Sequence, residues 1–399
     1  MQFPARYADL PEYAFPRLRR LLSDHAPGGA EIAMSLGEPQ HAVPPFVGPI
    51  MLEHQEKLSK YPPNESIPEL REAISDWLGF RYAVGLDYRD PETQIFPLNG
   101  TREGLYAACV SLCPEQKNGN RPAVLLPNPF YQCYTVAAVT AGAEPVYLPC
   151  TAETGHLPDF SNLSKDLLDR TAIAYICSPA NPQGVCADST YWRTLLELAE
   201  RHDFRVFADE CYSEIYRDQP PVGALQVASE IGADPERLVC FHSLSKRSNL
   251  AGLRSGFAVT GPENRNRMLQ MRSYVGAPLP IPAQHAATAC WQDEDHVIAN
   301  RKLYHQKYTI ADQVLGNAPG YMSPEAGFFV WLNIGNGEDA ALKLWKEAGV
   351  RALPGSYLSR PISAELGGGD PGERYLRLAL VAPAEDVQRG LEAVREVLL

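Results

Sequence analysis

The stretch HSLSKRSNLAGLRSGF, residues His242–Phe257, places one lysine, Lys246, among serines at the end of an apolar segment. The preceding residues 237–244, RLVCFHSL, predict a buried strand. Open α/β sheets bind their ligands beyond the carboxyl ends of the strands, so we expect the Lys246 amine at such an edge. A lysine whose pKa is lowered by burial can act as a nucleophile and form a Schiff base with an aldehyde. A solvated loop lysine is the ordinary alternative, and the surrounding residues must decide between the two.

Short apolar segments alternate with amphipathic stretches from about residue 66 to residue 290. This alternation predicts the α/β fold class, with a mainly parallel sheet. Helices are expected at residues 66–79, where Ser66 and Glu69 have the spacing of a capping box, and at residues 188–202. The expected strands are QIFPL (94–98), PAVLLP (122–127), EPVYLP (144–149), TAIAYIC (171–177), FRVFAD (204–209), RLVCFHSL (237–244) and LRSGFAVT (253–260).

A different pattern follows from about residue 282 and predicts a smaller α/β domain. A long helical stretch, 282–315, precedes the apolar segments GFFVWLNI (327–334) and RYLRLALV (374–381), with helices near 339–348 and from Ala384 onward. The proline-rich N-terminal arm has little periodicity, and we expect it to pack across this smaller domain. The predicted large domain is therefore 46–285, and residues 1–45 and 286–399 form the arm and the smaller domain.

Composition excludes several classes of function. Lys and Arg total 36 against 48 Asp and Glu, giving a formal charge of -12, which opposes binding to a nucleic-acid backbone. The nine cysteines form no C-x-x-C pair, which indicates reduced thiols and no zinc site. No apolar run has the length of a membrane span, and the N-terminus lacks a signal peptide's apolar core. We expect a cytoplasmic protein without a metal, membrane or nucleic-acid partner.

Donors suited to a phosphate surround Lys246 in the sequence. Ser243, Ser245 and Arg254 supply two hydroxyls and a guanidinium. A nucleophilic amine beside a phosphate site suggests an aldehyde that carries a phosphate, and pyridoxal 5'-phosphate is such a molecule. The turn Gly100-Thr101-Arg102, between a predicted strand and a helix, offers backbone N–H groups to the same phosphate.

Partners for the ring of this cofactor are found at other predicted strand ends. Asp209 ends FRVFAD and suits a protonated pyridine nitrogen, although a helix-capping aspartate is the alternative. Tyr212 and Asn181 can donate hydrogen bonds to the phenolate oxygen, although Asn181 also suits an ordinary turn. Tyr131 can lie flat on the ring or pack in the core.

One arginine, Arg377, interrupts the apolar strand RYLRLALV. A buried charge is costly unless it is paired. Two alternatives therefore stay open: an internal salt bridge, or bidentate binding of a substrate carboxylate.

The ordered motifs resemble the fold type I pyridoxal-phosphate aminotransferases of the aspartate aminotransferase superfamily. The motifs are Asn181-Pro182, Asp209-x-x-Tyr212, Ser243-x-Ser245-Lys246, Arg254 and Arg377. The resemblance covers nearly the whole chain and implies a large domain with a mainly parallel seven-stranded sheet. It implies that Lys246 is the Schiff-base lysine, Asp209 the ring-nitrogen partner, Tyr212 and Asn181 the phenolate donors, Tyr131 the stacking ring, and Gly100, Thr101, Arg102, Ser243, Ser245 and Arg254 the phosphate ligands.

The resemblance also implies roles that the residues alone do not indicate. Gly37, with Asn181 and Arg377, is expected to bind the substrate carboxylate. Tyr61, in KYPPNESIPELREAI, matches a tyrosine that reaches the phosphate of the neighbouring subunit, which implies a homodimer with shared active sites. Aspartate-specific members carry tryptophan where this chain has Tyr131, which argues against aspartate specificity.

Three longer segments resemble bacterial N-succinyldiaminopimelate aminotransferases of lysine and diaminopimelate biosynthesis: SLGEPQH (35–41), SLSKRSNLAGLRSGF (243–257) and RYLRLALVAP (374–383). Those enzymes exchange an amino group between glutamate and N-succinyl-2-amino-6-oxopimelate, with 2-oxoglutarate as the other product. The alternatives are an aspartate-, alanine- or aromatic-type aminotransferase, a cysteine-conjugate β-lyase, or a non-catalytic regulator that binds the cofactor. A regulator would need a DNA-binding module, and the sequence offers no basic N-terminal extension for one. Reading Ser243-x-x-Lys246 as a penicillin-recognising hydrolase fails because S-D-N and K-T-G are missing from the chain.

Overall fold

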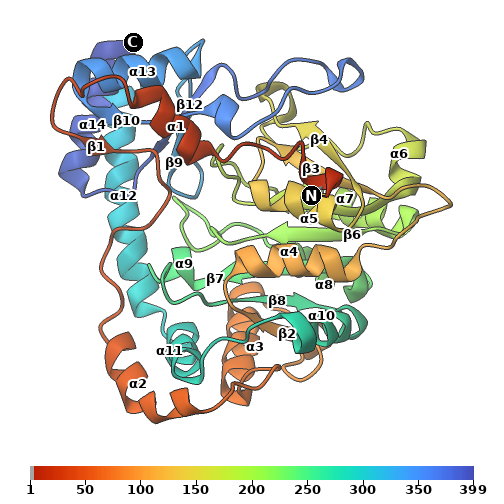
Figure 1. The fold of residues 1–399 in the computed structure, drawn as a ribbon. Helices are drawn as coiled ribbons and strands as arrows, with labels where there is room; N and C mark the ends of the chain where they lie inside the picture. Colours follow the sequence, from red (N-terminus) through yellow and green to blue (C-terminus); the bar gives the residue numbers. More distant parts are fainter. Residues whose placement is uncertain (1–3) are drawn as a thin grey trace.

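A seven-stranded sheet forms the centre of the molecule in the computed structural model, which describes residues 4–399 (Figure 1). The strand order is β2-β8-β7-β6-β5-β3-β4, and β8 alone runs antiparallel to its neighbours within this sheet. This confirms the predicted α/β fold, and each predicted strand of the large sheet is found. The strands are β2 (Ile95–Leu98), β3 (Ala123–Asn128), β4 (Glu144–Pro149), β5 (Thr171–Cys177), β6 (Arg205–Asp209), β7 (Leu238–Ser243) and β8 (Gly256–Thr260).

Helices cover both faces of this sheet. Successive strand side chains point to opposite faces, so Leu125 of β3 joins one apolar cluster while Val124 and Leu126 join the other. Burial on both faces explains the continuous apolar segments in the sequence. The first cluster contains α3 (Pro68–Tyr82), α6 (Lys165–Arg170), α7 (Ser189–His202), α8 (Ala224–Ile231) and α11 (Ile281–Gln292), and the second contains α4 (Thr101–Leu112), α5 (Gln132–Thr140) and α10 (Pro262–Val275).

A smaller unit, at the upper left of Figure 1, has its own apolar core. Its antiparallel sheet has the order β11-β12-β9, and a short parallel pair joins β1 to β10. The helix α12 runs from this core down toward α11 (Figure 1). The elements are β1 (Ile32–Ala33), β9 (Phe329–Asn333), β10 (Val350–Arg351), β11 (Leu353–Pro354), β12 (Tyr375–Ala379), α12 (Asp295–Leu315), α13 (Gly337–Ala348) and α14 (Ala384–Leu398).

The N-terminal arm packs on the smaller unit, as expected, but it is more regular than the sequence suggested. Helix α1 (Ala14–Leu22) presents Ala14, Leu18 and Leu22 to Trp345 of α13 and to β11. These positions are four residues apart, which is the spacing of an amphipathic helix. The arm continues into α2 (Val47–Glu53), which packs against α11.

Two details of the predicted helices are wrong. Helix α3 begins at Pro68 with Ile67 at its N-cap, and Ser66 has a φ of 71°, so the capping box does not form. The predicted helix 282–315 is two helices, because the chain turns at residues 293–294 between α11 and α12.

This turn is held by Arg247, the neighbour of Lys246 on α9 (Leu244–Arg247). The buried guanidinium donates to the carbonyl of Cys290 at 2.5 Å and pairs with Glu294. It also lies 4.9 Å from the ring centroid of Trp291. The carbonyls at a helix C-terminus need outside donors, and Arg247 supplies them to α11.

The domain boundary at residues 285/286 stays a prediction. Cys290 and Trp291 pack in the apolar cluster under the large sheet, so we propose that the chain passes to the smaller unit at residues 293–294. Within residues 4–399, no helix has both the length and the apolar character that a membrane span requires.

Candidate active site

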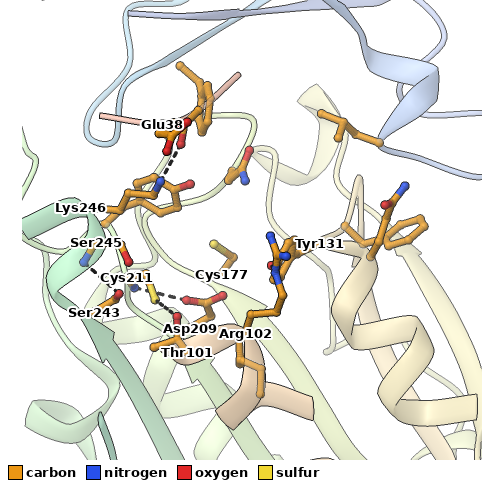
Figure 2. Close-up of a pocket in the computed structure, with 18 of the residues that line it drawn as sticks. Glu38, Thr101, Arg102, Tyr131, Cys177, Asp209, Cys211, Ser243, Ser245 and Lys246 are labelled. Atoms are coloured by element: carbon orange, nitrogen blue, oxygen red, sulfur yellow. Dashed lines mark hydrogen bonds between the residues drawn. The ribbon is translucent and has the colours of Figure 1, made fainter. Parts of the chain in front are cut away.

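A cavity of about 510 Å³ lies where the carboxyl ends of the parallel strands face the smaller unit (Figure 2). Cys177, Asp209 and Ser243, the last residues of β5, β6 and β7, all line it. This is where open α/β sheets bind ligands, and the volume suits a small molecule. The structure brings most of the predicted residues to this cavity: Gly37, Thr101, Arg102, Tyr131, Asn181, Asp209, Tyr212, Ser243, Ser245, Lys246, Arg254 and Arg377.

Lys246 extends into the cavity from α9, directly after β7. Its Nζ donates to the carbonyl oxygen of Gly37 at 2.6 Å and lies 5.3 Å from the ring centroid of Phe328. Burial lowers the pKa of Lys246 to about 8, and the charges of Arg377 and Arg254 act in the same direction. The amine can therefore lose and regain a proton near neutral pH, as a base in catalysis must.

Asp209 lies at the floor of the cavity with two donors on its carboxylate. Tyr134 donates through its hydroxyl at 2.6 Å, and the backbone N–H of Cys211 donates at 3.3 Å. Burial raises the pKa of Asp209 despite these donors, so a cation beside it would stabilise its ionised form. A protonated ring nitrogen is such a cation.

The sequence analysis missed Tyr134, although Tyr134 lies only three residues after Tyr131. Tyr131 is the N-cap residue of α5 and Tyr134 lies in its first turn, and both side chains line the cavity. The ring of Tyr134 stacks on Tyr175 at 4.4 Å, which fixes its direction toward Asp209.

Gly100 and Arg254 form a cradle at the N-terminus of α4. Gly100 has a φ of 84°, and a Cβ there would lie 2.2 Å from Nη2 of Arg254, so only glycine allows this approach. Arg254 itself has a φ of 59°, a strained conformation for a residue with a side chain. Free N–H groups in the first turn of α4, together with this guanidinium, suit a phosphate.

The side chain of Arg102 points elsewhere. Its Nε donates to the hydroxyl of Tyr131, and in Figure 2 both lie across Asp209 from Ser243 and Ser245. We propose that Arg102 offers its backbone N–H to the phosphate, as the sequence analysis expected of this turn, and not its guanidinium. Its exposed guanidinium then stays available at the cavity mouth.

Arg377 is a buried cation that faces the cavity from β12. Nη1 donates to Oδ1 of Asn181 at 3.0 Å, and Nη2 donates to the carbonyl of Ser35 at 2.8 Å. The buried Nε has no hydrogen-bond partner, and the ion pairs within residues 4–399 do not include this arginine. The salt-bridge alternative therefore fails, and Arg377 is placed to receive an anion from the cavity.

Gly37 is close to Arg377 through the ring of Phe329. The guanidinium lies 4.2 Å from the ring centroid, and a Cβ on Gly37 would lie 2.4 Å from its Cζ. Tyr212 packs against the same ring, 6.0 Å between centroids. Phe329 thus holds the predicted carboxylate site and a predicted ring donor together.

Three further residues of the cavity were not predicted. Cys177 and Cys211 lie beside Asp209, and the Sγ of Cys211 is 3.2 Å from Oγ1 of Thr101. Glu38 follows Gly37, and its charge acts on the Lys246 amine. By contrast, the side chain of Tyr61 is wholly exposed and lies outside the cavity.

Comparison with known proteins assigns the chain to a family. Residues 31–394 match the aminotransferase class I and II family. The chain belongs to this family. It is 30% identical to the LL-diaminopimelate aminotransferase of Dehalococcoides mccartyi strain 195, over 98% of this chain and 97% of that protein. Two solved structures are similar over essentially their whole length: an aminotransferase from Neisseria meningitidis Z2491 (35% identity, 100% of both chains, TM-score 0.92) and aminotransferase AspB from Helicobacter pylori 26695 (30% identity, 100% of this chain and 99% of that chain, TM-score 0.88).

The chain is thus a pyridoxal-phosphate-dependent aminotransferase acting on amino and 2-oxo acids. The cavity residues fit that cofactor. The Gly100–Arg254 cradle suits its phosphate, the Lys246 amine its aldehyde, and Asp209 its ring nitrogen. Within residues 4–399, no cluster of three or more His, Cys, Asp or Glu side chains is arranged to hold a metal ion.

We expect the Lys246 amine of the cofactor-free protein to titrate near pH 8 because burial disfavours its charged form. Reductive methylation at a series of pH values, followed by peptide mass spectrometry, measures this midpoint. The exposed Lys302 on α12, labelled in the same samples, is the reference. The native state binds this proton more weakly than the unfolded chain, so this group's contribution to stability rises from about pH 8 to 10.5. A midpoint above pH 10 would contradict the effect of burial.

Proposed function

We propose that this aminotransferase transfers an amino group from N-succinyl-LL-2,6-diaminopimelate to 2-oxoglutarate, or in the reverse direction from L-glutamate to N-succinyl-2-amino-6-oxopimelate, in lysine and diaminopimelate biosynthesis. Relatives named LL-diaminopimelate aminotransferase, 30% and 29% identical to this chain, support a substrate with the diaminopimelate skeleton. The observation that carries the choice of the succinylated form is the position of the Arg102 guanidinium at the cavity mouth.

Each group of cavity residues has a separate role in the proposed amino transfer. Lys246 removes the proton from the α carbon of the amino donor in one half-reaction and supplies a proton to the α carbon of the acceptor in the other, because its amine lies in the cavity with a lowered pKa. Asp209 holds a proton on the ring nitrogen. Arg377, Asn181 and Gly37 hold the α-carboxylate and so orient the α carbon. Bound at this site, pyridoxal phosphate supplies the electron sink that stabilises negative charge on that carbon.

The two diaminopimelate substrates differ in charge at the distal end. The free amino acid carries a distal ammonium, whereas the N-succinyl derivative has a neutral amide there and an additional carboxylate. Of the described residues that line the cavity, only Asp209 and Glu38 are carboxylates. Asp209 lies on the floor, and Glu38 follows Gly37, whose carbonyl binds Lys246. The cation of Arg102 at the mouth therefore favours the succinylated substrate.

LL-diaminopimelate itself is the second candidate, and the names of the relatives favour it. The two candidates predict opposite rankings in one assay. Both compounds are offered as amino donors to 2-oxoglutarate, and glutamate formation is followed.

We expect kcat/KM for the succinylated donor to be about tenfold to a hundredfold higher, the range of one charge-assisted hydrogen bond. Arg102→Gln should remove this advantage while changing the reaction with glutamate by less than about threefold. Faster turnover of free LL-diaminopimelate would establish the second candidate. Turnover of alanine, aspartate or aromatic substrates alone would contradict both.

We also propose that the enzyme is a homodimer whose active sites are shared. Tyr61 and Leu58 are 100% and 67% exposed, and Tyr274 and Val275 at the end of α10 are 82% and 75% exposed. Asn64 Nδ2 donates to the hydroxyl of Ser273 at 3.3 Å, which brings these two segments together. Exposed apolar side chains of this kind indicate a protein interface.

Light scattering should therefore give twice the chain mass of 44.0 kDa. Tyr61→Phe should keep that mass and raise the Kd for pyridoxal phosphate by about threefold to tenfold, because one hydrogen bond to the phosphate is lost. Phe80→Ser, which alters an exposed apolar residue on α3, is the control for a general surface effect. A monomer at assay concentration, or an unchanged Kd for the Tyr61 variant, would contradict the shared site.

A further inference from the structure

His41, the last residue of the SLGEPQH segment, is not among the residues that line the cavity and belongs to a polar network with α12. Its Nδ1 is 2.7 Å from Oδ1 of Asn300, and its Nε2 is 2.8 Å from Nζ of Lys307. Both partners belong to α12 and are buried. The network therefore ties the segment that carries Gly37 to the long helix of the smaller unit.

The hydrogen bonds fix the state of the imidazole. The Oδ1 of Asn300 also accepts from Nδ2 of Asn249, at 3.1 Å, so this oxygen is the acceptor for His41 as well. Nδ1 of His41 therefore carries the proton, and Nε2 accepts from the Lys307 ammonium. Burial lowers the pKa of His41, and the charge of Lys307 adds to this, so the imidazole stays neutral.

Asn300 and Asn249 also connect residues 37–42 and α12 with the segment that carries Lys246. Nδ2 of Asn300 donates to the carbonyl of Lys246 at 3.5 Å, and Nδ2 of Asn249 donates to the carbonyl of Ala42 at 3.3 Å. An aromatic row makes a second connection: the ring centroid of Tyr304 is 4.6 Å from that of His41 and 5.6 Å from that of Phe328. The Lys246 amine lies over Phe328. Two sets of contacts thus lead from His41 to Lys246.

Lys307 is an unusual residue to bury at 2% exposure. Besides His41, its Nζ donates to the carbonyl of Val381 at 3.1 Å and lies 5.2 Å from the Tyr304 ring centroid. All three partners are neutral, and the ion pairs within residues 4–399 do not include this lysine. A buried cation without a counter-charge costs stability, so an apolar residue of similar shape would serve the fold better. The stability of the fold therefore does not explain why a lysine is buried at position 307.

We propose that His41, Asn300 and Lys307 are positioning residues that hold residues 37–42 against Lys246 and thereby set the affinity for the substrate carboxylate. Gly37 makes two contacts in this segment: its carbonyl accepts a hydrogen bond from the Lys246 amine, and it packs against Phe329, whose ring also contacts Arg377. The kinetic part of the inference rests on the proposed function, in which Gly37 and Arg377 bind the carboxylate. The structural part, the tethering of residues 37–42, does not.

The test replaces Lys307 with methionine, which keeps the length of the side chain and removes the cation. Lys302→Met, at an exposed position of the same helix, is the matched control. Hydrogen–deuterium exchange of residues 37–42 is measured on the cofactor-free protein, so this readout does not depend on activity. Thermal unfolding and steady-state kinetics with glutamate complete the comparison.

We expect Lys307→Met to speed exchange in residues 37–42 by about tenfold and to raise the KM for glutamate by a similar factor, the effect of one charge-assisted hydrogen bond. The kcat should change by less than about threefold, and the midpoint of thermal unfolding should not fall. Unchanged exchange would overturn the tethering, and changed exchange with unchanged KM would overturn the kinetic part. A fall in unfolding midpoint with a loss of kcat at constant KM would show that Lys307 only supports the fold.

Two variants of His41 distinguish its hydrogen bond to Asn300 from its hydrogen bond to Lys307. His41→Gln can place an acceptor near the position of Nε2 and keep Lys307, whereas His41→Asn reaches only Asn300. The glutamine variant should therefore retain a KM closer to that of the wild type. Equal defects in the two variants would overturn the part assigned to Lys307. Wild-type protein without aminotransferase activity, but with the expected exchange pattern, would contradict the proposed function and leave the tethering intact.

Discussion

The hydrogen bond between the Lys246 amine and the Gly37 carbonyl joins the two halves of this molecule. Lys246 follows β7 of the large sheet, and Gly37 belongs to the arm that packs with the smaller unit. The amine can be reactive only because it is buried between them, where its pKa falls to about 8. Three features keep this amine in place. They are the order of the strands in the large sheet, the turn between α11 and α12 that Arg247 holds, and the network of His41, Asn300 and Lys307.

The arginine side chains and the carboxylate of Asp209 lie in separate parts of the cavity. Cations gather where a phosphate or carboxylate is expected, at Arg254, Arg377 and Arg102, while Asp209 stands at the floor. Burial raises the pKa of Asp209 and lowers that of Arg377, so a ligand of opposite charge stabilises the ionised form of each, whereas the lowered pKa of Lys246 suits a nucleophile and a base. Such a cavity suits an amphoteric cofactor and an amino acid better than a neutral ligand.

The sequence predicted the large sheet and most of the residues at its carboxyl edge. Strand periodicity and the ordered motifs are contained in short stretches of sequence, so they can be recognised from the sequence alone. Contacts between distant residues were not predictable. Tyr134 was missed as the partner of Asp209, and Arg247 had no assigned role, because its partners Cys290 and Glu294 lie more than 40 residues away.

The failures at helix ends have a similar physical origin. Ser66 and Glu69 have the right spacing for a capping box, but Pro68 fits the first helical turn and the N–H of Ile67 binds Gln284 instead. The other error, a single helix over residues 282–315, arises because Arg247 binds the end of α11 from outside that stretch. In both cases a tertiary partner outcompetes the local pattern.

The central claim is that one particular amine, that of Lys246, binds the cofactor. Borohydride reduction of the enzyme with pyridoxal phosphate, followed by peptide mass spectrometry, tests it most directly. The reduced linkage should be found on the peptide that contains Lys246 and should be lost in Lys246→Ala. A label on Lys307 or Lys117, the other lysines whose pKa burial lowers to about 8, or no label at all, would contradict the account.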